Sequence, residues 1–583
     1  MNFGLVLRAN GLLIFFLSIH LVSCLDCFFG DHIPVPAEDA FPCLYNTNIT
    51  EGTKRTILDI TKNSLDAYVF KDIVRNSPKS YPLRHISVDI DHEIEGVYNE
   101  TLGKEINAFN FYQIIQDKIF TPLADAHTQF IKPGCLAYVF IQPFTLGAKM
   151  VDEKFVIFAK AAQNYPSLGT DEITFWNKEE VSAVIGQEIT HIDGLPIIKA
   201  IQNFIHRYPM HSKDPSVNFN KAIQIDFMSR QSLMASGKLD RYDMEYTLSN
   251  GKRVTFKWAA LWSGFNDYMC DNADYTGGAS LLPSHETSVT PLKPDSDTLI
   301  YRIPSFMSRI NEELFLKSWR LTRNFTKLIV DLRGNGGGLV CEGMHLVQHL
   351  TSAPPPVYVD VRHSKLVDEL VRLSGNTSDQ WFGTGAWPDP KNSSVDYADW
   401  YGPRALRRGG KVAEYSEKLM YTGAREKSCV QSPNPWRSQG NFEQILLLTD
   451  GNCGSTCAIF TTLMSKQHEH VKTVTTGGLP HQKHMSFSTF PGGLSSLSDC
   501  ADGGRLRCEL DDFAFDRVEP QSKRNFCTDS DADFSEFRAD TVRGQELPDE
   551  FTFYPADHRL MMWPGVNDDE DRELYERVDA LFT

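Results

Sequence analysis

Apolar residues in the second half of the chain recur as short runs that break into a turn and then into helical spacing. The clearest runs are KLIVDLRGNGGG, from Lys327, and QILLLTDGNCGSTCAIF, from Gln444. Residues 297–303 form another apolar run. Repeated strand–turn–helix units predict a mainly parallel sheet flanked by helices. The turns that follow such strands meet at the carboxyl edge of the sheet, where ligands bind in open α/β folds.

The first half of the chain has a different pattern. Residues 53–74 and 111–130 repeat apolar positions at three- and four-residue steps, which predicts amphipathic helices, the second ending near the turn at Asp125. From about residue 146 to 290 the pattern becomes strand-like. Residues 188–192 alternate as a strand, an Asp-Gly turn follows, and residues up to 206 form an amphipathic helix. Asn250-Gly251 predicts the turn of a hairpin within residues 244–258.

The N-terminus has the pattern of a secretory signal. Arg8 precedes an apolar run over residues 12–22, and small residues follow before Cys24. A buried N-terminal helix is the alternative. No later segment is long and apolar enough to cross a bilayer, so residues 1–24 predict a secreted protein without a transmembrane segment.

Cysteines and sequons support an exported protein. Removing Cys24 with the signal leaves eleven of the twelve cysteines, of which most should pair in an oxidising compartment. Proximity suggests Cys27–Cys43 and a pair among Cys500, Cys508 and Cys527, but the connectivity stays open. No cysteine or histidine spacing suggests zinc. Five Asn-x-Ser/Thr sequons are typical of a secreted glycoprotein: Asn48, Asn99, Asn324, Asn376 and Asn392.

Charge excludes some partners. The 583 residues carry a net charge of -17. This balance argues against nucleic acid or an anionic membrane surface as a partner. The length predicts two to four domains.

Ser455 is the first candidate for chemistry. It follows a buried strand and opens a helix, where a serine is most often only an N-cap. Gly454 permits a tight turn, and the helix dipole and the Thr456 N–H could stabilise an oxyanion. The Gly-x-Ser-x-Gly elbow is absent, because Cys453 and Cys457 occupy the two glycine positions.

Gly336, Gly337 and Gly338 form the second candidate turn. The run lacks the spacing and the Gly-Lys-Ser/Thr ending of a phosphate-binding loop. A tight turn that only connects the strand to the helix is another interpretation without catalysis. Together with Ser455, backbone N–H groups of this turn predict an oxyanion hole.

A serine nucleophile needs a base. His127, in the turn Asp125-Ala126-His127, is the leading candidate, although a histidine in a turn is more often a surface or capping residue. His481, Lys483 and His484 compete with it. A lysine could act as the base if desolvation lowered its pKa.

The motifs together resemble the tail-specific (C-terminal-processing) serine protease superfamily. The matching sequences are DAHTQF at Asp125, LIVDLRGNGGG at Leu328, LLLTDGNCGSTCAIFT at Leu446, TTGGLPHQKHMSF at Thr475 and FTFYPADHRLMM at Phe551. Within that superfamily the chain is similar to the branch of chlamydial protease-like activity factor and its secreted fungal relatives. The resemblance covers nearly the whole chain after the signal.

The resemblance implies an α/β fold with a crotonase/ClpP-like serine protease core, a PDZ-like β-rich inserted domain and a mainly helical N-terminal region. The corresponding domains are 1–24 as the signal peptide, 25–145 as the helical region carrying the base histidine, 146–290 as the PDZ-like domain and 291–583 as the protease core. The strand-like pattern of residues 146–290 agrees with that arrangement.

Carried over to this sequence, the resemblance makes Ser455 the nucleophile and His127 the general base. It makes backbone N–H groups of Gly336, Gly337 and Thr456 the oxyanion hole. The bacterial enzymes use a Ser–Lys dyad, but no Gly-Lys-Gly follows the serine here, so we favour Ser–His over a Ser455–Lys483 dyad.

The relatives also place an acidic residue after the serine. The insertion at residues 500–533 disturbs that spacing, so Glu536 is the first expectation and Asp540 the second. Residues 529–536 alternate aspartates like the start of an EF-hand, but Phe534 replaces the turn glycine, and a solvated acidic loop is expected. Residues 568–571 are expected to form a solvated helix start.

The sequence therefore predicts a secreted serine endopeptidase that acts on polypeptides through an acyl-enzyme, with no metal or organic cofactor. Three alternatives stay open. The chain could be a catalytically silent binding protein on the same fold, a lysine-dyad protease, or a precursor cut within residues 383–437 or near Pro291. Self-processing and a homodimer are further expectations for its partners.

Overall fold

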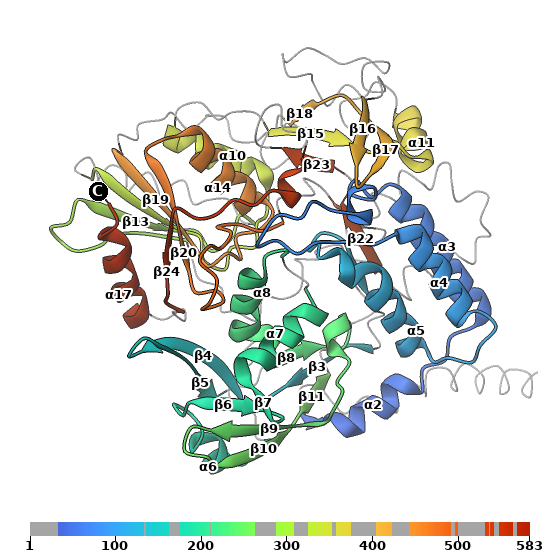
Figure 1. The fold of residues 1–583 in the computed structure, drawn as a ribbon, viewed down its shortest axis with the longest axis horizontal. Coiled ribbons are helices and arrows are strands. Elements are labelled where there is room, and N and C mark those ends of the chain that lie inside the picture. Colours follow the sequence, from blue (N-terminus) through green and yellow to red (C-terminus); the bar gives the residue numbers. More distant parts are fainter. Residues whose placement is uncertain are drawn as a thin grey trace, which may run out of the picture.

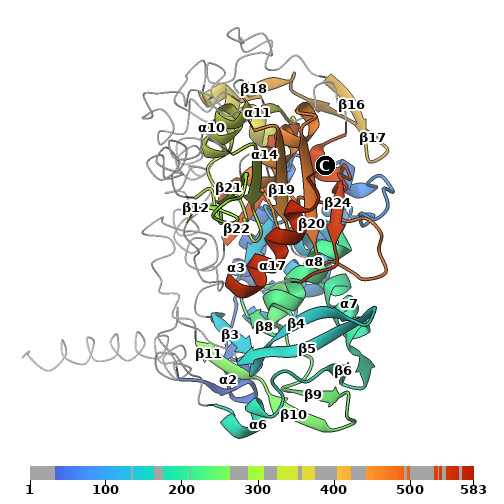
Figure 2. The same cartoon turned by 90° about the vertical axis from the view of Figure 1, so that its left-hand side faces the viewer.

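The computed structural model describes residues 33–132, 136–162, 175–209, 212–262, 287–307, 325–351, 357–374, 404–421, 442–490, 496–498, 531–535, 537–540, 547–563 and 568–582. The proposed signal peptide, Cys27, and the sequons at residues 324, 376 and 392 lie outside these ranges. The described part forms two lobes, with the strand-rich region below the core in Figure 1 and again in the turned view of Figure 2.

Helices dominate the N-terminal region, which lies to the right of the core in Figure 1. They are α2 (Ala37–Tyr45), α3 (Glu51–Asp66), α4 (Ile90–Thr101) and α5 (Ala108–Ile115), with short turns η1 (Ile73–Arg75), η2 (Gln116–Phe120) and η3 (Thr121–Leu123). Thr50, Asp89 and Asn107 cap three of these helices through side-chain oxygens. The expected helix over residues 53–74 ends at Asp66, so its length was overpredicted. Residues 67–72 form turns instead, and Tyr68 and Phe70 there are buried.

The strand-rich region holds two antiparallel sheets and a hairpin. One sheet has the order β1 (Val35–Pro36), β11 (Ala259–Trp262), β3 (Tyr138–Ile141), β8 (Ser229–Gln231). The other has the order β10 (Arg253–Lys257), β9 (Asp243–Leu248), β6 (Ile189–Ile192), β7 (Leu195–Pro196). The hairpin is β4 (Phe144–Val151) with β5 (Lys154–Ala162). The remaining elements are β2 (Gln129–Ile131), α6 (Lys178–Ser182), α7 (Ile197–Arg207), α8 (Pro215–Lys221), η6 (Ala222–Asp226) and η7 (Ala235–Gly237).

Two sequence predictions for this region are confirmed. The β9–β10 hairpin turns at Asn250-Gly251, and Gly251 has a φ of 82° that glycine adopts without strain. Strand β6, the turn at Asp193-Gly194 and helix α7 follow one another as the alternation predicted.

The core is a six-stranded sheet in the order β12 (Ser288–Pro291), β13 (Thr298–Arg302), β14 (Lys327–Asp331), β19 (Gln444–Thr449), β20 (Val471–Thr476), β24 (His558–Leu560). Only the β12–β13 pair is antiparallel. The predicted mainly parallel sheet is therefore confirmed.

Helices cover both faces of this sheet. Residues that point to one face, such as Ile329 and Leu446, pack with Leu574 and Val578 of α17 (Asp568–Asp579). Helices α10 (Val340–Thr351) and α14 (Thr456–Gln467) contact each other and lie beside the sheet in Figure 1. Burial on both faces explains why the strands are continuous apolar runs.

Smaller elements connect the regions. These are β15 (Val357–Val361), α11 (Lys365–Ser374), β16 (Arg404–Arg408), β17 (Lys411–Tyr415), β18 (Leu419–Tyr421), β21 (Ser496–Ser498), β22 (Asp531–Ser535), β23 (Phe537–Asp540) and η11 (Asp549–Phe551). The expected acidic loop at residues 529–536 is wrong, because residues 531–535 form β22 between β2 and β21. Pairing on both edges gives this acidic segment a strand conformation.

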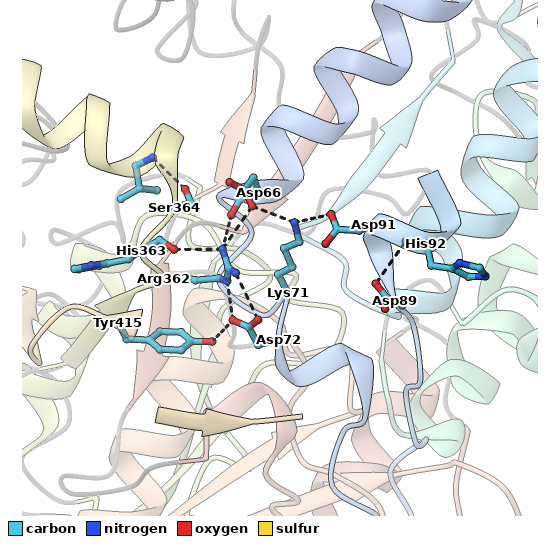
Figure 3. Close-up of polar contacts among 11 residues, drawn as sticks. Asp66, Lys71, Asp72, Asp89, Asp91, His92, Arg362, His363, Ser364 and Tyr415 are labelled. Carbon is cyan, nitrogen blue, oxygen red and sulfur yellow. Dashed lines mark hydrogen bonds and ion pairs between the residues drawn. The ribbon is translucent and has the colours of Figure 1, made fainter. Parts of the chain in front are cut away.

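A network of ion pairs joins the N-terminal helices to the β15–β17 segment (Figure 3). Arg362 lies between the chain around Asp66 and the buried Asp72, and its Nε is 2.7 Å from Asp72 Oδ2. The Tyr415 hydroxyl donates to the same carboxylate, and Lys71 pairs with Asp66 and Asp91. These contacts connect residues almost 300 positions apart in the sequence.

Candidate active site

The two candidate turns lie side by side. Strands β14 and β19 are parallel neighbours, and the glycine turn follows one while the Ser455 turn follows the other. The Asp450 carboxylate joins the turns, because its Oδ1 accepts the N–H groups of Gly334 at 3.2 Å and Asn452 at 3.0 Å. The sequence prediction that both turns share one edge is therefore met.

Asn335 holds the two turns in register. Its side chain is fully buried, accepts the Gly337 N–H through Oδ1 at 2.9 Å and donates to the Ile303 carbonyl at 2.9 Å. Its own carbonyl accepts the Gly454 N–H at 3.1 Å. One residue thus fixes the glycine turn and the residue before Ser455.

Gly337 packs directly against the nucleophile turn. A Cβ built on Gly337 would lie 2.6 Å from Ser455 Cβ and 3.0 Å from the Thr456 nitrogen, and Gly337 has a φ of 110°. Only glycine fits both the space and the backbone conformation. Its N–H donates to Asn335 Oδ1 at 2.9 Å in this conformation, and the role of Gly337 as an oxyanion donor stays a prediction. Among the described residues, the N–H groups of Gly336 and Thr456 have no acceptor.

Ser455 is positioned as an N-cap but does not act as one. It precedes α14, yet its side chain makes no capping hydrogen bond, and its φ of 51° and ψ of −123° are rare for an L-residue. Its hydroxyl is therefore not engaged by the helix end. Cys453 and Cys457 form a disulfide across this turn.

His127 is fixed by the turn that follows η3. The Asp125 Oδ1 accepts the His127 backbone N–H at 2.9 Å, and its Oδ2 accepts the hydroxyls of Thr128 and the buried Tyr68, each at 3.0 Å. The Lys213 ammonium donates to the Ala124 carbonyl at 3.1 Å, at the start of the same turn. Asp125 thus positions the backbone that carries the imidazole.

Phe490 contacts both proposed catalytic residues. Its carbonyl accepts the Ser455 N–H at 3.1 Å, and its ring lies edge-on to the His127 imidazole with the ring centroids 5.2 Å apart. The ring also covers Gly454, where a Cβ would lie 2.0 Å from the ring atom Cζ. The structure thus brings Ser455 and His127, which are more than 300 residues apart in sequence, to one aromatic residue.

Burial sets the electrostatics of His127. It lowers the pKa of the His127 imidazole below its usual value, although the nearby Asp125 carboxylate opposes the shift. The Nδ1 atom is buried and has no partner among the described residues. Burial also raises the pKa of Tyr68 well above its usual value, and Asp125 and Glu550 add to that effect.

The competing bases have a different environment. His481, Lys483 and His484 are exposed. A lysine base needs a site shielded from water, whereas Lys483 lies exposed. His127 differs from these three residues, because its Nδ1 atom is buried.

The acidic member stays a prediction. Glu536 lies outside the described residues, and Asp540 ends β23 opposite Tyr358, with no description of its side chain. A different carboxylate, Glu550, is buried near the His127 turn and pairs with Lys213. No motif in the sequence points to Glu550.

Sequence reasoning also missed Asn335 and Phe490. Asn335 precedes Gly336 in the glycine motif, and an Asn-Gly step indicates a turn. The sequence therefore predicts the turn, but it does not predict the hydrogen bonds by which Asn335 joins the two turns. Phe490 had no signal, because its contacts with Ser455 and His127 arise only through the fold.

Residues 297–479 match the sequence model of Peptidase family S41. The chain contains an S41 peptidase domain. The match covers the glycine turn and Ser455 and ends before Phe490.

Similarity to named proteins supports this assignment. A protein of Diaporthe leptostromiformis described as Peptidase S41 family protein phomP1' is 28% identical over 202 residues, which are 31% of this chain and 29% of that protein. The matched part is thus less than a third of the relative, and phomP1 from the same organism is 27% identical over the same shares.

Among solved structures, mature CPAF complexed with lactacystin has a TM-score of 0.51 at 16% identity, over 91% of this chain and 97% of that one. This likeness extends the S41 peptidase fold beyond the matched domain. Within the described ranges, no helix has both the length and the apolarity that crossing a bilayer requires.

Proposed function

We propose that this protein is a secreted serine endopeptidase in which Ser455 is the nucleophile and His127 the general base. The observation that supports this most is the pair of contacts made by Phe490, with the Ser455 backbone and the His127 ring. The S41 domain supports peptide-bond hydrolysis as the reaction class. The disulfide at Ser455 agrees with an oxidising compartment.

The proposed reaction begins with proton transfer. We assign the accepting atom to His127 Nε2, because Nδ1 is enclosed by protein. Burial keeps the imidazole neutral at pH 7, which is the form that can accept the Ser455 proton. The Ser455 oxygen then attacks the peptide carbonyl, and a tetrahedral intermediate forms.

Backbone donors stabilise the negative charge of that intermediate. The N–H groups of Thr456 and Gly336 are the candidates, since Gly337 donates to Asn335. His127 then gives its proton to the leaving amine, and water hydrolyses the acyl-enzyme by the same steps in reverse. Every step uses groups of this chain and the substrate.

Other parts of the prediction enter as proposals. We assign the strand-rich region at residues 146–290 to a PDZ-like domain and polypeptides to the substrates. Helix α8 in this region supports a role near the active site. Asn220 donates to the carbonyls of Asp450 and Thr476, and Asp214 accepts the Ser486 N–H. Self-processing, a homodimer and precursor cleavage stay predictions.

Ser455→Ala tests the proposal. Purified wild-type protein should cleave an unfolded protein substrate, and the variant should lose at least about a thousandfold of that activity. Circular dichroism should show the same fold for both. A fluorophosphonate should label wild type at Ser455 and leave the variant unlabelled.

The outcomes separate the alternatives. Undiminished cleavage by Ser455→Ala would refute the nucleophile. Absence of both labelling and cleavage in correctly folded wild type would favour the binding protein. Because mature CPAF was solved with lactacystin, loss of activity on adding lactacystin is a second readout, and Ser455 is the site to examine for its attachment by mass spectrometry.

A further inference from the structure

A disulfide encloses the proposed nucleophile. Cys453 lies two residues before Ser455, and Cys457 lies two residues after it as the second residue of α14. Both cysteines are fully buried. The disulfide therefore links the two sides of the turn that carries Ser455.

The short loop limits what this bond does for global stability. In the chain-entropy view, the stabilisation by a disulfide grows with the length of the loop that it closes, and here the partners are only four positions apart. The main effect is therefore expected to be local, on the geometry of the turn.

The turn needs local support. Ser455 has the backbone angles φ 51° and ψ −123°, and such conformations persist only where the surroundings fix them. The other constraints are hydrogen bonds: Gly454 N–H to Asn335, Ser455 N–H to Phe490 and Cys457 N–H to the Gly454 carbonyl. The disulfide is the covalent constraint in this set.

We propose that the Cys453–Cys457 disulfide is a positioning element for Ser455, and that it makes hydrolysis depend on oxidation of this pair. The proposal rests on the proposed function of Ser455. Opening requires a thiol reductant: two thiols each lose one electron and one proton, the S–S bond accepts them to give two cysteine thiols, and the reductant leaves as its own disulfide. With the bond open, the turn relaxes and the hydroxyl leaves the position that His127 and the oxyanion donors require.

The consequence is a protease that reaches full activity only after this pair is oxidised. Thiols stay reduced in the cytosol and pair in the secretory pathway. The chain would therefore acquire a competent nucleophile only after entering an oxidising compartment. Both cysteines are buried, so a closed disulfide should resist small thiols in the folded protein more than an exposed one.

The test compares wild type with the double variant Cys453→Ala/Cys457→Ala, both as full chains purified under oxidising conditions. The variant should lose at least about tenfold in kcat for a peptide substrate, with KM nearly unchanged, because strain of this kind corresponds to one or two powers of ten in rate. The rate of fluorophosphonate labelling at Ser455 should fall in parallel. The melting temperature should change little.

Dithiothreitol provides the matched control. Because the bond is buried, the dithiothreitol concentration and incubation time are raised until peptide mapping after alkylation shows residues 453 and 457 as free thiols. Under those conditions wild-type activity should fall to the level of the double variant. Reoxidation should restore the activity. The double variant has no such bond, so the same treatment should leave its remaining activity unchanged, and equal loss in both proteins would assign the effect to other disulfides and overturn the proposal.

Retention of wild-type kcat by a folded double variant would overturn the proposal as well. If the variant does not fold, the dithiothreitol and reoxidation cycle on wild type is the deciding test. The proposal is wrong if wild-type activity persists while peptide mapping shows that both cysteines are free thiols. Failure of the proposed function is a separate result, in which oxidised wild type neither cleaves nor becomes labelled.

Discussion

At the residue scale, the site is packed so closely that even one added side-chain atom would clash. Gly337 is the clearest case, because its Cα lies against Ser455 and its φ is positive. Asn335 and Asp450 then fix the turn on which it stands. Small side-chain additions here should act on catalysis before they act on the fold.

Gly337→Ala should lower kcat/KM by about a hundredfold, since displacement of a catalytic group by about 1 Å has that effect. The added Cβ would lie 2.6 Å from Ser455 Cβ and 2.7 Å from the Gly454 carbonyl oxygen, so the serine turn must move. Peptidase assays measure the loss. Gly96→Ala is the control, because it lies in α4 with no atom within 4 Å of the new Cβ. Equal activity of the two variants would show that the contact is not restrictive.

The pH profile should report the burial of His127. In the proposed mechanism the neutral imidazole is the active form, and burial lowers its pKa below the ordinary value of about 6.5. Activity should therefore fall on the acid side with a midpoint below pH 6.5, as His127 becomes protonated. The profile of kcat/KM between pH 4 and 8, with circular dichroism to confirm folding, measures this.

A variant of Phe490 tests the cause. Phe490→Ala removes the ring that covers His127, so the acid limb should move toward higher pH, while Phe490→Leu keeps apolar cover and should move it less. The charged and polar groups close to this turn are Asp125, Glu550 and Lys213, with Tyr68 beneath them. An acid limb above pH 7 in wild type would contradict the assignment of His127.

At the element scale, the C-terminal helix is part of the core. The acidic start of α17 was expected to be solvated, but Asp571 is buried and pairs with Arg302 at 2.9 Å and Arg333 at 2.8 Å. Arg333 also pairs with Asp331 at the end of β14, five residues before Gly336. The expectation failed because a charge run looks the same whether its partners are water or distant arginines.

Asp571→Ala should lower the free energy of unfolding by about 3 kcal/mol, because it leaves the buried Arg333 and the partly buried Arg302 to share the Asp331 carboxylate. Urea unfolding followed by circular dichroism measures the change. Glu573→Ala is the control on the same helix, since Glu573 is exposed and pairs only with Arg577 among the described residues. Glu573→Ala should lower the free energy of unfolding by less than about 0.5 kcal/mol. An equal loss for both variants would contradict the role assigned to the Asp571 ion pairs in joining α17 to the core.

At the scale of the whole molecule, networks of hydrogen bonds and ion pairs join parts that are distant in sequence. One is the Arg362–Asp72 network of Figure 3, and another connects α8 to the loops that follow β19 and β20. A fold assembled in this way places His127, from the helical region, beside the core turn that carries Ser455.

Asp72→Ala should cost about 3 kcal/mol of unfolding free energy, because Asp66 at 3.7 Å would be the one carboxylate left to Arg362 among the described residues, beside the Asp66 and His363 backbone carbonyls, and Tyr415 would lose its acceptor. Thermal and urea unfolding measure it. Glu38→Ala removes an exposed pair with Lys257 and should cost under about 1 kcal/mol. Similar midpoints for the two variants would show that the network does not bind the regions together.

The sequence by itself determined the elements whose signals are local. The strand–turn–helix units around Lys327 and Gln444, helix α7 and the Asn250-Gly251 hairpin depend on neighbouring residues, so periodicity and turn chemistry were sufficient to predict them. The position of Ser455 at the end of a strand followed from the same logic.

Only the tertiary structure decided the contacts between distant positions. The end of α3 at Asp66, strand β22 in an acidic segment, the burial of Asp571 and the place of Phe490 between Ser455 and His127 all depend on partners tens to hundreds of residues away. Such partners leave no periodic trace, because the free energy that selects them comes from burial and pairing after the chain has folded.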